Sequence, residues 1–294
     1  MATIWTIKRV LDWTIGYLDR KGDERPRLSA EWLLSAVTGL SRVELYVNFD
    51  KPLSPDELAR MHVAVERRGK GEPLQYVTGE MPFRHIVLKC EEGVLIPRPE
   101  TEILVDAALE GIDAHGGADA WPRVLDLCTG TGCIACSIAG ERDGARVIAT
   151  DLSPQAVTLA TRNAEALGLG AVVDVVECDL ASGIPDELMG TFCVLVSNPP
   201  YIPSAVVPTL PQEVAGFEPR LALDGGDDGL DLFRRILALA PRMLKRGGWL
   251  CVELFEENVG TAADLTREQG GWKYVEVRED LTHRPRVLVA VREE

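Results

Sequence analysis

Apolar positions recur at helical spacing through the first part of the chain. The first helical face carries Ile4, Ile7, Val10, Leu11, Ile15 and Leu18. "SAEWLLSAV" shows a second apolar face and "SRVELYV" a short third, while "SPDELARMHVAVERR" begins with Ser54 and Glu57 at the spacing of a capping box. The pattern predicts a small helical bundle over residues 1–75, which could dock a partner or only stabilise the rest of the chain.

Residues 76–98 differ, because glycine and proline recur among short alternating runs. The runs "HIVLK" and "GVLIP" predict a linker followed by a β-hairpin. The next stretch, "PETEILVDAALEG", has proline near its start, acidic residues in its first turn and glycine at its end. These features are typical of a helix.

From residue 123 onward, short apolar strands alternate with helical patterns. Strands are predicted at "RVLDL", "RVIAT", "VVDVVE", "FCVLVS", "GGWLCVEL", "KYVEVRE" and "RVLVAVR", and helices at 132–140, 154–167, 228–245 and 257–269. This alternation indicates a parallel sheet covered on both faces. Only "DLTHRP" joins the last two strands, so these must pair antiparallel. The prediction is an α/β fold over residues 99–294, with a seven-stranded, mostly parallel sheet and a terminal antiparallel strand.

Composition places the chain among ordinary globular proteins. Its 294 residues are 46% hydrophobic and 26% charged. Charges interrupt the N-terminal stretch, and no window approaches eighteen apolar residues, so we expect neither a signal peptide nor a membrane span. Seven cysteines, an odd number, fit a reducing compartment better than a disulfide framework. We therefore expect a cytoplasmic protein, monomeric and without a membrane partner.

Charge and metal-ligand spacing narrow the function classes. The formal net charge is −15, and residues 76–294 carry 19 Lys and Arg against 35 Asp and Glu, so nucleic acid is not expected as a direct partner. Cys128, Cys133 and Cys136 match an iron–sulfur spacing, C-x₄-C-x₂-C, but they fall in a predicted strand-to-helix turn, where small apolar residues pack. The four histidines are scattered. No metal is expected.

Residues suited to ligand binding follow the predicted parallel strands at their carboxyl ends. After Asp126, the loop "CTGTG" lets the backbone approach a ligand at the start of a helix. Asp151, after the next strand, can accept hydrogen bonds from both hydroxyls of a ribose, and Asp179 is placed to reach an adenine edge. The predicted cofactor site comprises Asp126, Cys128, Thr129, Gly130, Thr131, Gly132, Asp151, Asp179, Leu180 and Asn198.

The fourth strand ends at "NPPY", residues 198–201. Pro199 and Pro200 cannot donate hydrogen bonds and have a fixed φ, so the chain must leave the sheet as a rigid hook. Asn198 offers both an acceptor and donors, and nearby carbonyls lack sheet partners. This hook could hold a planar amide or amine, and we predict catalytic roles for Asn198, Pro199, Pro200 and Tyr201.

Two cofactors fit the glycine loop. Residues 130–135 satisfy G-x-G-x-x-A with an acidic residue about 20 positions on, as in nicotinamide-dinucleotide sites. S-adenosylmethionine is the alternative, since it has a ribose and an adenine but no pyrophosphate, and Asp126 could lie near its charged groups. The antiparallel terminal strand and "NPPY" favour S-adenosylmethionine.

Several longer motifs carry a family resemblance. "LDLCTGTGCIA" and "SNPPY" resemble the class I methyltransferase fold. From about residue 70 to the C-terminus, "PLQYVTGEMPF", "GVLIPRPETEILV", "FEPRLALDGGDDGLDLFRRIL" and "DLTHRPRVLVA" resemble the peptide chain release factor N5-glutamine methyltransferase family. The resemblance implies S-adenosylmethionine as cofactor and a release factor as protein partner, methylated on the glutamine of its Gly-Gly-Gln motif.

The resemblance also suggests residue roles. The Asn198 side-chain carbonyl and the Pro199 backbone carbonyl would each accept one N–H of the glutamine amide, and Tyr201 would wall the pocket or close the loop from the core. Cys128 departs from the general cofactor motif, which has glycine there. Because cysteine adopts positive φ less freely, we expect Gly130 and Gly132 to make the close approach.

Other interpretations remain open on the sequence alone. A glutamine methyltransferase acting on a ribosomal protein has similar motifs around "LDLCTG" and "NPPY", and a DNA adenine methyltransferase shares the four-residue hook. A non-catalytic docking module and a nicotinamide-dependent dehydrogenase are the remaining alternatives. The sequence leaves four residues without a decided role: Arg98, Glu100, Glu218 and Arg220.

Overall fold

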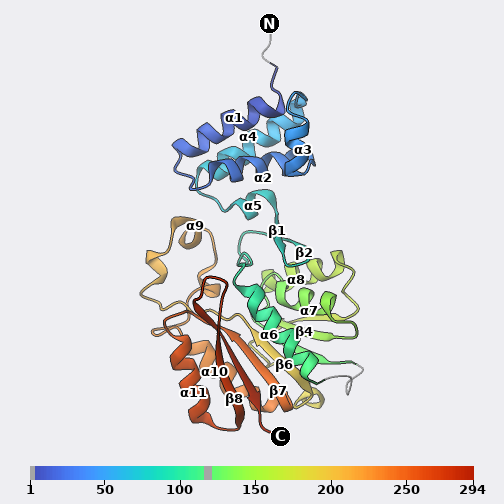
Figure 1. Cartoon of the computed structure of the whole chain (residues 1–294), viewed down its shortest axis with the longest axis vertical. Coiled ribbons are helices and arrows are strands. Elements are labelled where there is room, and N and C mark those ends of the chain that lie inside the picture. The colour runs from blue at the N-terminus through green and yellow to red at the C-terminus, as the bar shows by residue number, and fades with distance from the viewer. Residues whose placement is uncertain (1–3, 116–120) are drawn as a thin grey trace. The chain divides into compact units, whose positions relative to one another are not determined.

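The computed structural model describes residues 4–115 and 121–294 (Figure 1). The chain forms two compact units. The helical unit comprises the chain up to Glu80 together with Pro211–Phe217, and the sheet unit comprises Met81–Leu210 and Glu218–Glu294. A segment from the middle of the sequence is therefore part of the helical unit.

The helical unit confirms the predicted bundle and adds one short helix. Its N-terminal helices are α1 (Ile7–Arg20), α2 (Pro26–Thr38), α3 (Arg42–Val47), α4 (Pro55–Gly69) and α5 (Leu74–Thr78). The predicted capping box is present at α4, since the Ser54 hydroxyl accepts from the Glu57 amide and the Glu57 carboxylate accepts from the Ser54 amide. The five residues of α5 carry too short a pattern to predict a helix.

A buried arginine holds the inserted segment in the helical unit. Arg68, on α4, lies 2.7 Å from a carboxylate oxygen of Asp23 and 3.1 Å from one of Glu213. Glu213 belongs to the short helix α9 (Gln212–Ala215). The Arg68 side chain is 10% exposed, so its ion pairs are screened less than surface pairs are.

The hairpin of the sheet unit differs in one strand from the prediction. Its strands are β1 (Glu80–Phe83) and β2 (Ile86–Lys89), so "HIVLK" is a strand. The prediction of "GVLIP" as a strand was wrong, because residues 93–97 have no regular structure. Gly93 has a φ of +91°, and the proline ending the run cannot donate to a sheet.

The large sheet confirms the predicted fold class. Its strands are β3 (Arg123–Leu127), β4 (Arg146–Asp151), β5 (Val173–Glu177), β6 (Phe192–Ser197), β7 (Leu244–Glu253), β8 (Trp272–Glu279) and β9 (Pro285–Arg292). Their order is β5-β4-β3-β6-β7-β9-β8, and β9 pairs antiparallel with both of its neighbours. The antiparallel strand is last in the sequence but lies inside the sheet, between β7 and β8.

Helices cover both faces of this sheet (Figure 1). One core cluster contains residues of α6 (Thr101–Ala114), α7 (Cys133–Glu141) and α8 (Pro154–Ala166), and the other contains residues of α10 (Asp231–Met243) and α11 (Val259–Gln269). Strand residues alternate between the two: Val194 packs in the first cluster and Leu195 in the second. The unbroken apolar strands arise from this burial on both faces. Within the described residues, short 3₁₀ helices also occur at Asp186–Leu188, Val207–Thr209 and Arg220–Ala222.

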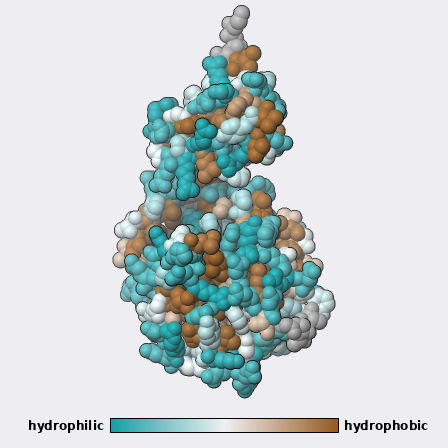
Figure 2. Space-filling model, viewed as in Figure 1, coloured by the Kyte–Doolittle hydropathy of each residue, from teal (hydrophilic) through white to brown (hydrophobic). Residues whose placement is uncertain are grey.

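The surface is mostly hydrophilic on the face shown in Figure 2, with hydrophobic residues in small separate areas. Among residues 4–115 and 121–294, no helix is both long enough and apolar enough to cross a membrane.

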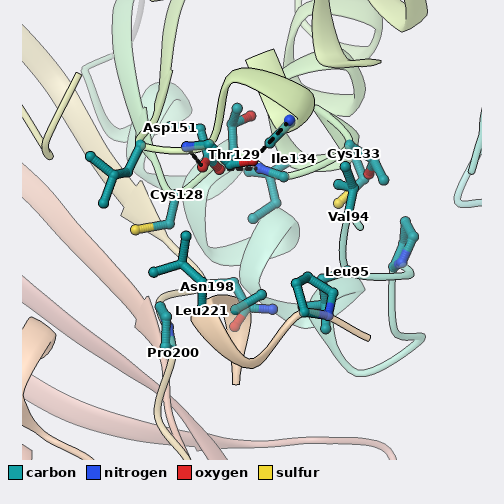
Figure 3. Close-up of a pocket in the computed structure, with 18 of the residues that line it drawn as sticks. Val94, Leu95, Cys128, Thr129, Cys133, Ile134, Asp151, Asn198, Pro200 and Leu221 are labelled. Carbon is teal, nitrogen blue, oxygen red and sulfur yellow. Dashed lines mark hydrogen bonds between the residues drawn. The ribbon is translucent and has the colours of Figure 1, made fainter. Parts of the chain in front are cut away.

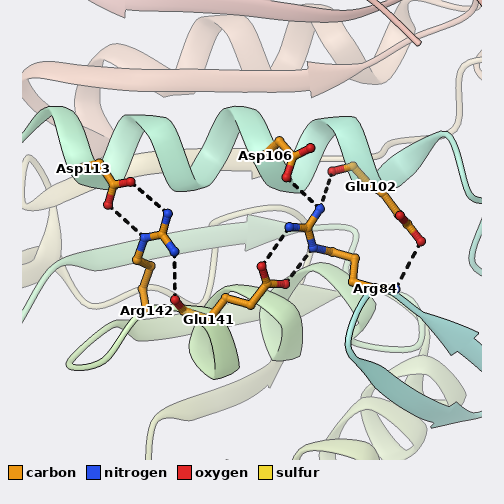
Figure 4. Close-up of polar contacts among 6 residues, drawn as sticks. All are labelled: Arg84, Glu102, Asp106, Asp113, Glu141 and Arg142. Atoms are coloured by element: carbon orange, nitrogen blue, oxygen red, sulfur yellow. Dashed lines mark hydrogen bonds and ion pairs between the residues drawn. The ribbon is translucent and has the colours of Figure 1, made fainter. Parts of the chain in front are cut away.

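An arginine network joins the hairpin to two helices (Figure 4). The Arg84 guanidinium, in the turn between β1 and β2, donates to both carboxylate oxygens of Glu141 at 2.6 and 2.8 Å. It also lies 2.8 Å from Asp106 and donates to the backbone carbonyl of Glu102. This guanidinium lowers the pKa of Glu141.

We predict that Arg84→Ala lowers the free energy of unfolding by about 2–3 kcal/mol, because it leaves the half-buried Glu141 carboxylate without its cation. Arg142→Ala is a matched control. Arg142 forms a similar two-bonded pair with Asp113, whose side chain is 57% exposed, so about 1 kcal/mol or less is expected. Denaturant unfolding of the variants checks this, and equal losses would contradict it.

Candidate active site

The candidate site lies where the parallel strands end. β3 pairs with β4 on one side and with β6 on the other, and Leu127 is in register with Thr150 and Ser197. The loops after these strands consequently emerge at one edge of the sheet. They line a cavity with about 960 Å³ of empty volume, part of it open to solvent (Figure 3). The predicted residues that line it are Cys128, Thr129, Gly130, Thr131, Asp151, Asp179, Leu180, Asn198 and Pro200.

The glycine loop turns sharply between β3 and α7. Gly130 has a φ of +58° and Gly132 of +81°, a region that favours glycine. Cys128 also has a positive φ, +61°, and lines the cavity, although we expected it to fit this position less well than glycine. Gly132 lies outside the cavity lining, and a side chain there would come within 3.2 Å of Ala160. The two glycines therefore have different roles. Gly130 faces the cavity, and Gly132 allows α7 to pack closely against α8.

Asp126 lies behind this loop, outside the cavity lining. Its side chain is fully buried, and Oδ2 accepts a hydrogen bond of 2.7 Å from the Thr129 hydroxyl. Oδ1 has no hydrogen-bond partner among the residues that the structure describes. Burial, with a smaller contribution from the Asp151 charge, raises the pKa of Asp126 to about 7. Asp126 therefore anchors the loop, and its direct role toward a cofactor stays a prediction.

Two further acidic residues line the cavity in different surroundings. The Asp151 carboxylate accepts hydrogen bonds of 2.9 Å from the backbone amides of Gly130 and Ser153, and burial raises its pKa. Each carboxylate oxygen can accept more than one hydrogen bond, so the ribose role remains compatible with this geometry. Asp179 forms a 2.7 Å ion pair with the exposed Arg235. Its neighbour Leu180 is buried and has a φ of +51°.

Asn198 is held in one orientation at the cavity wall. Its side-chain Nδ2 donates a 3.1 Å hydrogen bond to the hydroxyl of Thr101, at the start of α6. The amide nitrogen is thus directed to the protein, and the carbonyl Oδ1 is the end that can accept a hydrogen bond from a ligand. Asn198 and Pro200 lie on one side of the cavity in Figure 3, and Thr129 and Asp151 lie on the other.

The rest of the "NPPY" hook supports the wall from behind. Pro199 and Tyr201 are outside the cavity lining. The Tyr201 hydroxyl donates a 3.1 Å hydrogen bond to Glu253, and burial raises the pKa of Tyr201. This placement favours the role of a core tyrosine that closes the loop over that of a pocket wall.

Two further segments complete the cavity, one without regular structure and one that includes the 3₁₀ helix Arg220–Ala222. The sequence patterns gave little reason to expect both. Residues 93–98 form one wall, and residues 219, 221 and 222 form another. The Arg98 guanidinium pairs with the Glu218 carboxylate, which is almost fully buried and also accepts from the Ile96 amide. This pair joins the two segments. Arg220 instead pairs with Asp224 at the surface, and Glu100 only precedes α6. In the sequence, the signals for these two walls were "IPRP" within "GVLIPRPETEILV" and "FEPR" within "FEPRLALDGGDDGLDLFRRIL".

Comparison with known proteins gives the family. A model described as the PrmC N-terminal domain matches residues 9–79, and one described as the methyltransferase small domain matches residues 109–210. The release factor glutamine methyltransferase of Geobacter sulfurreducens is 50% identical over 251 residues, 85% of this chain and 84% of the relative. The chain belongs to the release factor glutamine methyltransferase family. The enzyme of the same name from Chlorobaculum tepidum is 42% identical, over 89% of this chain and 90% of the relative.

Solved methyltransferase structures have the same fold as this member of the release factor glutamine methyltransferase family. The human METTL16 catalytic domain, in complex with a MAT2A 3′UTR hairpin, superposes with a TM-score of 0.56 at 18% identity, over 81% of each chain. A methyltransferase from Pyrococcus furiosus gives 0.52 at 18% identity, over 70% of this chain and 89% of that one. Membership of the release factor glutamine methyltransferase family confirms the methyltransferase alternative over the dehydrogenase.

We predict that Gly130→Ala and Gly132→Ala separate cofactor binding from stability. Gly132→Ala should cost about 1–3 kcal/mol of unfolding free energy, because its side chain meets the backbone of α8 at a strained φ. Gly130→Ala has no protein atom within 4 Å of its new carbon, so its cost is about 1 kcal/mol. The same carbon narrows the cavity, and S-adenosylmethionine affinity should fall about tenfold. Calorimetric titration measures the cofactor affinity of each variant, and thermal unfolding measures its stability. A larger loss of affinity in Gly132→Ala together with a larger loss of stability in Gly130→Ala would refute the prediction.

We also predict a pH-dependent stability difference between the wild type and Asp126→Asn. The folded pKa of Asp126, about 7, lies above its ordinary value of 3.8, so folding favours the protonated form. This contribution is complete below the ordinary value and disappears as pH rises through about 7. From pH 5 to 8 the wild type should lose about 2–3 kcal/mol relative to Asp126→Asn. The same difference in unfolding free energy between the wild type and Asp126→Asn at pH 5 and at pH 8 would contradict the prediction.

Proposed function

We propose that this chain transfers a methyl group from S-adenosylmethionine to the side-chain amide nitrogen of the glutamine in the Gly-Gly-Gln motif of peptide chain release factors. Its curated relatives bear the corresponding name. The structural observation that carries the proposal is the Asn198–Thr101 hydrogen bond, which leaves a carbonyl oxygen for the acceptor amide. We infer that the enzyme acts as a monomer in the cytoplasm and serves translation termination.

The residues around the cavity fit the cofactor. Gly130 offers a backbone approach without a side chain, and a Cβ there would meet no protein atom within 4 Å. Asp151 provides acceptor oxygens for ribose hydroxyls, and Asp179 and Leu180 line the region after β5. The buried, unpartnered Oδ1 of Asp126 adds negative potential behind the loop when ionised. S-adenosylmethionine supplies an electrophilic methyl group on a positively charged sulfur.

An amide nitrogen is a weak nucleophile because its lone pair is delocalised into the carbonyl. The protein therefore has to orient the acceptor. Asn198 Oδ1 and the Pro199 backbone carbonyl would each accept one N–H, and the rigid prolines keep these two acceptors at a fixed separation. Fixed alignment of reactants can be worth on the order of 7–11 kcal/mol. We assign no general base, since the methylated nitrogen is acidic while cationic and can release its proton to water.

We predict that the purified protein adds one methyl group to the Gly-Gly-Gln glutamine of an unmodified release factor, and that Asn198→Ala lowers kcat by about 10²–10³-fold. Cofactor affinity should change little, because Asn198 contributes to the acceptor side. Gln269→Ala is a control that removes a side-chain amide bonded to the Leu237 carbonyl, away from the cavity lining, and it should keep wild-type activity.

Peptide mass spectrometry locates the methyl group, and calorimetric titration measures cofactor binding. If the wild type binds S-adenosylmethionine but methylates a ribosomal-protein glutamine instead, the proposed substrate is wrong and the reaction class stands. Full activity of Asn198→Ala would refute the proposed role of "NPPY".

A further inference from the structure

An exposed leucine lies in the wall of the candidate site and has no role in the account above. Leu221 lines the cavity and is 58% exposed. In Figure 3 it lies on the same side of the cavity as Asn198, opposite Asp151. A single exposed leucine on a protein surface is ordinary, but this one lies beside the proposed position of the methyl acceptor. No pattern in the sequence singled out Leu221.

The segment that carries Leu221 is held at its upstream end by a buried charge. Leu221 belongs to the 3₁₀ helix Arg220–Ala222. Two residues before this helix, Glu218 is 6% exposed, and its carboxylate pairs with the Arg98 guanidinium of the wall formed by residues 93–98. Because breaking a buried ion pair is costly, this end of the segment has little freedom to move.

The downstream end of the segment is paired with the chain that follows the "NPPY" hook. The Ile202 amide donates a hydrogen bond of 2.9 Å to the Leu223 carbonyl, and the Gly225 amide donates one of 2.8 Å to the Ile202 carbonyl. Ile202 directly follows the hook in the sequence. Backbone hydrogen bonds thus fix the position of Leu221 relative to the hook.

We propose that Leu221 is a substrate-binding residue whose side chain packs on the aliphatic part of the acceptor glutamine and on the peptide backbone next to it. The inference rests on the proposed function, in which Asn198 receives the glutamine amide. The amide is polar, whereas the Cβ and Cγ groups of a glutamine are apolar, so its binding site needs contacts of both kinds. Glycines beside the glutamine have no side chains that would hold the backbone away from an apolar wall.

The alternative is that the cofactor covers Leu221. Another leucine of the cavity lining is better suited to that role, because Leu152 directly follows Asp151, the proposed ribose ligand, and is 55% exposed. Leu221 comes instead from the segment that is paired with the end of the hook. The cofactor and the acceptor would thus each have an apolar contact of their own, on different sides of the cavity.

The first test removes the leucine side chain. In Leu221→Ala we expect the KM for the release factor to rise about tenfold, because the apolar area that the substrate covers is lost. The kcat and the Kd for S-adenosylmethionine should stay within about twofold, since neither the hook nor the cofactor side is changed. Leu221→Met keeps a flexible apolar side chain and should retain most of the wild-type affinity for the release factor. Calorimetric titration of enzyme loaded with S-adenosylhomocysteine measures that affinity directly.

Val87→Ala is the matched control. Val87, on β2, is 53% exposed and lies outside the cavity lining, so its KM should equal that of the wild type. Both changes affect exposed side chains, and both variants should unfold at the wild-type temperature. A wild-type KM in Leu221→Ala, or the same rise in Val87→Ala, would overturn the proposal. A loss of S-adenosylmethionine affinity in Leu221→Ala as large as the rise in KM would also overturn it.

A second measurement detects the contact without turnover. The methyl NMR signals of Leu221, assigned by their loss in Leu221→Ala, should shift when a release factor is added to enzyme saturated with S-adenosylhomocysteine, whereas those of Val87 should not. S-adenosylhomocysteine alone should shift the signals of Leu152 and leave those of Leu221 nearly in place. A shift of Leu221 by S-adenosylhomocysteine alone, with no further shift on addition of the release factor, would show that the cofactor covers it and would overturn the proposal. Absence of both release factor binding and methylation in the wild type would instead refute the proposed function, and this inference with it.

Discussion

Parallel pairing of β3 with β4 and β6 is the constraint on which the rest of the structure depends. Parallel strands share a direction, so their carboxyl ends meet at one edge, and the register places Leu127 beside Thr150 and Ser197. The loops that follow these strands therefore line a common cavity. Burial of alternate strand residues in two separate clusters fixes this register, since a shift by one residue would exchange the two faces.

Polar groups around the cavity are supported by contacts with more distant parts of the chain. The glycine loop is held by the carboxylates of Asp126 and Asp151, and the hook by Thr101 and Glu253. The Arg98–Glu218 pair joins the wall formed by residues 93–98 to the wall formed by residues 219, 221 and 222. Asp126, Glu253 and Glu218 are buried, where hydrogen bonds and ion pairs are strong but leaving one unmade is costly. Such a site is pre-organised before any ligand arrives.

Local patterns were sufficient for the elements and for part of the site. The glycine loop and "NPPY" are contiguous signals at strand ends, and each lies at the cavity as a unit. Tyr201 was harder to place, because its direction depends on Glu253, 52 positions away. Thr101 is 97 positions from Asn198. No periodicity or spacing encodes such pairs. The run "GVLIP" was misleading for the opposite reason: its alternation is typical of a strand, but no strand pairs with it in the part of the chain that the structure describes.

The division of the chain into units has a consequence for how the protein could have been assembled. Because Pro211–Phe217 belongs with the N-terminal helices, the backbone passes between the two units three times instead of once. A gene fragment that ends at Glu80 would encode α4 without Glu213, one of the two acidic partners of Arg68. The helical unit therefore cannot be transferred to another protein by recombination at a single linker, because that would separate the N-terminal helices from Pro211–Phe217.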